Sequence, residues 1–169
     1  TAMDDINKGG FFLINDGNGN FNPDYSILDY GYYEIYTAEL AYVDSDSSID
    51  LILGGSFPHP ENPERNENVM VFYNSGGVFS TTNSSVIPQP QIVQGDGGVV
   101  TDLAIKDIDG DGFKEVISLG GFTNDGVEDY FFQIASHNGD FNFTDKTAEL
   151  MEASNGSHQG GFMRFRVQD

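Results

Sequence analysis

Short apolar runs alternate with clusters of Gly, Asn, Asp and Ser along most of the chain. The runs are rich in Val, Ile, Phe and Tyr, which favour extended structure, whereas the clusters between them consist of turn formers. A helical period lasts for a turn only over residues 146–153. The pattern therefore predicts an all-β protein of short antiparallel strands.

One hairpin pattern occurs three times, as an aromatic-rich run, a turn containing Gly, and a Phe. The copies cover residues 10–21, 69–79 and 130–141 and end at Phe21, Phe79 and Phe141. Their spacings are 79 − 21 = 58 and 141 − 79 = 62 residues. Turns of this kind between apolar runs are strong hairpin signals, and a regular spacing indicates a repeat of about 60 residues.

The most specific motif is an acidic segment set between two apolar runs. Four carboxylates fall within the nine residues 107–115, and glycines at 110 and 112 allow the positive φ of a tight turn. Alternating carboxylates on a turn suit a hard divalent cation such as Ca²⁺, although a solvated acidic turn is the alternative. The expected ligands are Asp107, Asp109, Asp111, the carbonyl of Phe113, and Glu115.

A second acidic segment aligns with the first. Residues 44–52 lie over residues 109–117 at an offset of 109 − 44 = 65, and both segments continue into a Gly-Gly pair. Tyr42 stands where the alignment would require Asp107, so we expect weak or no binding by Asp44, Asp46 and Asp50. A turn held by hydrogen bonds from the backbone to these side chains is an equal alternative.

The repeat unit reads as strand, acidic loop, strand, connection, strand, Gly turn, strand. Residues 34–98 form a unit with the weaker acidic loop, and residues 99–163 form a unit with the full loop. Residues 1–33 form a partial unit with a linker, and residues 164–169 begin a further unit.

The charge balance narrows the function. Seven Lys and Arg against 27 Asp and Glu give a net charge of −20, which argues against nucleic acid and anionic membrane as partners. No apolar run approaches the length of a membrane span, so we expect no membrane insertion. Cysteine is absent. An acidic surface with a calcium loop suits an extracellular, periplasmic or cell-surface location.

The loop 107–115 with Val116-Ile117 after it, and the hairpins over 15–21 and 74–79, resemble the FG-GAP/VCBS-type repeat of calcium-binding β-propellers. Integrin α-subunit heads carry such repeats. The resemblance covers nearly the whole chain and implies about two complete four-stranded blades plus a partial one. Since propellers close with about four to eight blades, we expect further blades or self-association.

Two functions follow from this resemblance. The first is a non-catalytic, calcium-stabilised module for adhesion, which binds a protein or a polysaccharide. The alternative is a fragment of a propeller-type polysaccharide lyase or glycosidase, but the chain has no Gly-x-Ser-x-Gly or His-Glu-x-x-His motif.

Two segments are candidates for ligand binding. Tyr30, Tyr32 and Tyr33 belong to an aromatic cluster that either stacks on sugar rings or packs between blades. His59 lies in the proline-rich segment 57–66, which we expect to be a loop between two strands.

Overall fold

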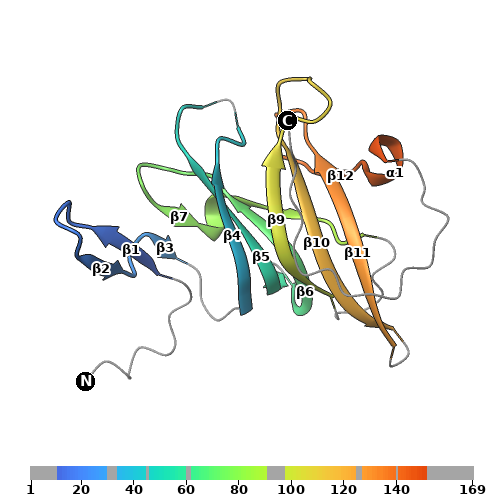
Figure 1. The fold of residues 1–169 in the computed structure, drawn as a ribbon, viewed down its shortest axis with the longest axis horizontal. Helices are drawn as coiled ribbons and strands as arrows, with labels where there is room; N and C mark the ends of the chain where they lie inside the picture. Colours follow the sequence, from blue (N-terminus) through green and yellow to red (C-terminus); the bar gives the residue numbers. More distant parts are fainter. Residues whose placement is uncertain are drawn as a thin grey trace.

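The computed structural model describes residues 11–29, 34–44, 46–59, 62–90, 98–124, 127–139 and 141–151 (Figure 1). The described chain is all-β, as the apolar pattern predicted. Its helical elements are the 3-10 turn η1 (Thr81–Asn83) and the single turn α1 (Thr147–Leu150), which lies within the predicted segment 146–153.

The first four-stranded sheet is an antiparallel meander in the order β4-β5-β6-β8. The acidic segment 44–50 joins its first two strands, and the Gly turn at residues 76–77 lies between its last two. Its strands are β4 (Glu34–Ala41), β5 (Asp50–His59), β6 (Asn62–Phe72) and β8 (Ser84–Ile87).

The second four-stranded sheet has the same plan. Its order is β9-β10-β11-β12, where the strands are β9 (Gly98–Lys106), β10 (Glu115–Asn124), β11 (Val127–Ser136) and β12 (Thr144–Asp145).

The ladders confirm the offset between the two acidic segments. Ala41 pairs with Asp50 in the first sheet, and Lys106 pairs with Glu115 in the second. Both differences, 106 − 41 and 115 − 50, equal 65.

A smaller unit lies at one end of the molecule (Figure 1). The strands β1 (Phe12–Asn15) and β2 (Phe21–Asp24) form the first predicted hairpin. The short β3 (Leu28–Asp29) pairs in parallel with β7 (Phe79–Ser80), and this pair ties the unit to the first sheet.

The core consists of two layers. One layer lies between the two four-stranded sheets, where Ile52, Val69 and Val71 of the first sheet pack with Val116 and Phe131 of the second. The other layer covers the opposite face of the first sheet, where Leu51, Met70 and Phe72 pack with Phe12 and Leu28. Because β5 is buried on both faces, its apolar residues form a continuous run instead of alternating with polar ones.

The Gly-Gly pair in β10 marks a close approach of the backbone. A Cβ on Gly120 would lie 2.4 Å from both the Phe131 ring and the Val99 carbonyl oxygen. A Cβ on Gly121 would meet nothing nearer than 3.5 Å. The register of β9 against β10 shifts between Leu119 and Gly120, so the pair coincides with a bulge.

The prediction of a loop over residues 57–66 was wrong. Pro58 pairs with Asn66 and His59 with Asn62, so the segment extends the β5–β6 hairpin. The pairing of β4 with β5 runs only as far as Ser56. Pro58 therefore lies in a two-stranded ribbon, where a missing N–H does not interrupt a sheet interior.

Candidate metal centre

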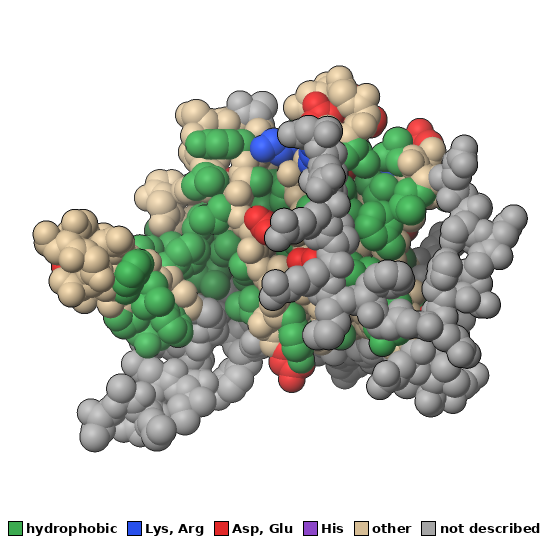
Figure 2. All heavy atoms as spheres, in the orientation of Figure 1, with side chains coloured by type: hydrophobic (Ala, Val, Ile, Leu, Met, Phe, Trp, Pro, Cys, Tyr) green, Lys and Arg blue, Asp and Glu red, His purple; other side chains and the backbone are tan. Residues whose placement is uncertain are grey.

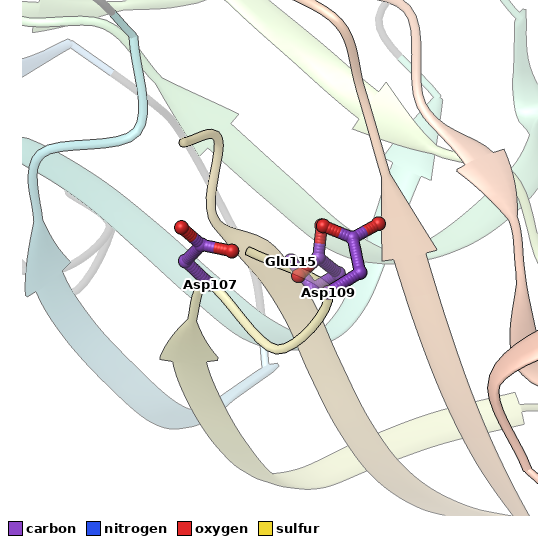
Figure 3. A group of neighbouring side chains, drawn as sticks. All are labelled: Asp107, Asp109 and Glu115. Atoms are coloured by element: carbon purple, nitrogen blue, oxygen red, sulfur yellow. The ribbon is translucent and has the colours of Figure 1, made fainter. Parts of the chain in front are cut away.

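Three carboxylates converge where β9 ends and β10 begins (Figure 3). Asp107 directly follows β9, Asp109 lies on the loop, and Glu115 is the first residue of β10. One oxygen from each lies within 4.8 Å of the others. The cluster therefore joins two neighbouring strands at one end of the second sheet.

The loop takes its shape from backbone N–H groups that donate to its own carboxylates. The amide of Gly110 donates to Oδ1 of Asp107 at 2.7 Å, and the amide of Gly112 donates to Oδ2 at 3.1 Å. Both glycines have positive φ, +79° and +96°, which explains why the sequence places glycine there. The side chain of Asp107 is thus fixed in position by the turn.

The remaining predicted ligands, Asp111 and Phe113, follow on the same loop. Asp111 is exposed and accepts the N–H of Phe113 at 2.8 Å, and its carboxylate is not part of the group of three. The ring of Phe113 packs on His137, with centroids 5.6 Å apart, and against Gly139, where a Cβ would lie 2.9 Å from it. His137 thus supports the loop from the β11–β12 turn, a role that no local motif in the sequence indicates.

Glu115 is the distinctive member of the cluster. Its side chain is fully buried, and Oε2 accepts the N–H of Ile108 at 2.8 Å. Its other oxygen, Oε1, is also buried and has no hydrogen-bond partner. Leaving a buried acceptor unsatisfied costs on the order of 1–3 kcal/mol, and more when the group is charged.

A hard divalent cation fits these residues. Every side-chain donor is a carboxylate oxygen, which Ca²⁺ and Mg²⁺ prefer. Two oxygens that each lie about 2.4 Å from one Ca²⁺ are at most about 4.8 Å apart, and the three carboxylates meet this limit.

The corresponding loop of the first sheet satisfies its acid in another way. The N–H of Val43 donates to Oδ2 of Asp50 at 3.0 Å, which matches the bond from Ile108 to Glu115. The N–H of Asn74 also donates to Oδ1 of Asp50, again at 3.0 Å. Both oxygens of Asp50 therefore have partners, unlike those of Glu115.

The two other acids of this loop also accept backbone amides. Oδ1 of Asp44 accepts the N–H of Asp46 at 2.9 Å, and Oδ1 of Asp46 accepts the N–H of Ser48 at 2.6 Å. Burial raises the pKa of Asp44 above 3.8. The amide of Asp46 opposes this rise in pKa, and the charges of Asp50 and Asp46 add to it. Asp109 and Asp111 accept amides in the same way, so it is the satisfied carboxylate of Asp50 that favours a hydrogen-bonded turn here over a second cation site.

The predicted ligand-binding residues add little to the site. Tyr30, Tyr32 and Tyr33 lie outside the described residues, and so does the segment 164–169. His59 is the last residue of β5, and the structure describes its backbone but not its side chain. Tyr36, from the same aromatic segment, is exposed on β4, and its hydroxyl donates to Glu34 at 3.2 Å.

No protein-family model, curated protein or solved structure matches this chain significantly. In the described part of the chain, no helix is both long enough and apolar enough to cross a membrane.

Proposed function

We propose that residues 107–115 bind Ca²⁺ and that the chain is a calcium-stabilised, non-catalytic β-sheet module. The observation that carries this proposal is the buried Oε1 of Glu115, which has no hydrogen-bond partner and belongs to a group of three carboxylates. A cation would satisfy this oxygen and offset the repulsion among the three charges.

The ion would add to the ladder that already pairs β9 with β10 at this point, where Lys106 lies opposite Glu115. Asp107 and Glu115 bracket the connection between β9 and β10, and Asp109 lies on the connection itself. A shared cation would hold both strand ends against the loop. Irregular, flexible oxygen ligands favour Ca²⁺ over Mg²⁺, which requires a near-octahedral set.

We further propose that the two four-stranded sheets are blades of a propeller of the FG-GAP/VCBS type. The support is their common plan: strands in sequential order, an acidic connection between the first two strands, and face-to-face packing. These features agree with the resemblance, and a propeller would require further sheets beyond these two.

An extracellular or surface role in binding a protein or polysaccharide follows from these two proposals. Calcium sites of extracellular modules are typically weak, with dissociation constants of about 0.1–1 mM, and they fill only where calcium is abundant. The net charge of −20 is consistent with such a medium, where bound cations reduce self-repulsion.

Calcium titration of the purified chain, by calorimetry and by thermal unfolding, tests the proposal. The wild type should show one saturable site that Glu115→Gln abolishes. Asp129→Asn is the matched control, because Asp129 is an exposed acid of the same sheet outside the loop, and it should bind as the wild type does. The proposal would be refuted if the wild type showed neither binding heat nor a shift in melting temperature at a calcium concentration about ten times the weakest expected dissociation constant.

A further inference from the structure

The hairpin at the end of the molecule carries an exposed apolar face. Leu13 lies opposite Pro23, and Phe21 lies opposite Asn15 on the same side of the ribbon. The rings of Phe11 and Tyr25, 5.3 Å apart, extend this surface. We call the surface formed by Phe11, Leu13, Phe21, Pro23 and Tyr25 the hairpin face.

The hairpin face is unusually open to solvent. Phe11, Leu13, Phe21 and Tyr25 are 51%, 56%, 58% and 39% exposed. Hydrophobic side chains gather on this end of the molecule in Figure 2. The hairpin already packs on the first sheet through Phe12 on its other side, but contiguous apolar surface left exposed on a folded protein usually marks an interaction site.

The internal repeat indicates what kind of surface covers this face. The bonds that close the two turns, from Asp16 N–H to the Asn20 carbonyl and from Ser75 N–H to the Val78 carbonyl, align Asn15 with Asn74. The offset before the turn is therefore 74 − 15 = 59, one more than the offset after it, because the first turn is one residue longer. Phe11 then aligns with Met70, and Leu13 with Phe72. Met70 and Phe72 are both 0% exposed, because the β1–β3 unit packs on them.

The same relation holds one unit further along. Ala135 of β11 pairs with Val116 as Phe72 pairs with Leu51, and Ala135 is buried against the first sheet. In both complete sheets, an apolar surface of another β unit therefore covers this face.

We propose that the hairpin face packs against the hairpin face of a second copy of this chain, related by a two-fold axis. The face presents no charged side chain, since its other outward residue is Asn15, whereas the chain as a whole carries a net charge of −20. Contact through this surface brings two acidic chains together without placing like charges in the interface.

A head-to-tail stack fits the structure less well. It would require an open apolar face on the far side of the second sheet, opposite the core layer. The residues there, Ile117, Leu119 and Ile134, are only 2%, 6% and 3% exposed. Of these two faces, as far as their described residues go, only the hairpin face is open, and the isologous contact needs no other.

The size of the face sets the expected affinity. If each of its four large side chains buries about 100 Å², each copy contributes about 400 Å², below the roughly 800 Å² per partner of a standard interface. The dimer should therefore be weak, with a dissociation constant on the order of 100 µM.

Sedimentation velocity from about 5 to about 500 µM chain tests the contact. The wild type should shift from monomer towards dimer, and Leu13→Glu should remain monomeric over the whole range. Leu40→Glu is the matched control, because Leu40 is similarly exposed, at 49%, on β4. It should dimerise as the wild type does.

The association should persist in EDTA, because the hairpin face contains no residue of the acidic loop. A failure of the dimer proposal is therefore distinguishable from a failure of the proposed calcium site. A monomeric wild type at the highest concentration, or equal loss of dimer in both Glu variants, would overturn the proposal.

A cysteine variant tests the symmetry. The chain has no cysteine, so Leu13→Cys introduces a single thiol. A two-fold contact predicts that mild oxidation links the two copies through this thiol at concentrations where the dimer forms. A dimer that does not cross-link would mean that the hairpin face packs on a different surface, which contradicts the isologous contact.

Discussion

Replacing Glu115 by Gln should have opposite effects on stability with and without calcium. The substitution keeps the shape of the side chain and an oxygen to accept the N–H of Ile108, but it removes the buried charge. Without a cation, that charge faces two other carboxylates. The neutral amide should therefore stabilise the cation-free protein and prevent calcium from doing so.

The distances set the size of both effects. Two charges 4.8 Å apart repel by about 3 kcal/mol at an effective dielectric constant of about 20. Because Asp109 is exposed and backbone amides hold Asp107, we expect a net gain of only about 1–3 kcal/mol for the Gln variant in EDTA. Calcium at about 100 times its dissociation constant should stabilise the wild type by about 2.7 kcal/mol, or about 8 °C in melting temperature.

Thermal and urea unfolding of both proteins, in EDTA and in excess calcium, measure these changes. The order of stability should reverse between the two conditions, with the variant more stable in EDTA and the wild type more stable in calcium. A variant that is less stable in both conditions would mean that the charge of Glu115 does not destabilise the cation-free protein, and it would refute the reasoning. An equal calcium shift in both proteins would do the same.

Three further substitutions test other features of the structure. Asp50→Asn should cost about 2 kcal/mol in urea unfolding, equally with and without calcium, because its carboxylate accepts backbone amides; a smaller calcium shift would contradict this. Gly120→Ala should lower the free energy of unfolding by about 2–3 kcal/mol, whereas Gly121→Ala should change it little because its methyl group has room. Equal melting temperatures of these two variants would refute the close approach at Gly120. Burial raises the pKa of Asp44 above 3.8, so the folded chain holds this proton more tightly than the unfolded chain. The wild type should therefore gain stability relative to Asp44→Asn as the pH falls from 7 through the folded-state pKa towards 3.8, and parallel pH profiles of unfolding in EDTA would contradict this.

Local features of the fold were predictable because local sequence specifies them. Apolar runs separated by turn residues mark the strands, and the glycines at 110 and 112 do adopt the positive φ that the turn requires. The offset of 65 between the acidic segments follows from side-by-side alignment and reappears in the ladders. The segment 57–66 was predicted incorrectly because a proline is tolerated where β4 no longer flanks β5, and neighbouring strands are not visible in the sequence.

The candidate site was predictable in composition but not in detail. The spacing of acids identified Asp107, Asp109 and Glu115, and it also suggested Asp44, Asp46 and Asp50. The difference between the two loops depends on the N–H of Asn74, 24 residues from Asp50 in sequence, which only packing brings to the carboxylate.

By itself, the sequence determined that this protein is a repeat of antiparallel strands with acidic connections, because periodicity and turn chemistry act over a few residues. Tertiary structure alone decided which acid keeps a buried oxygen without a partner and which copy of a repeated face stays exposed. Those outcomes depend on contacts between strands far apart in the chain, and equivalent residues in a repeat differ only through their neighbours.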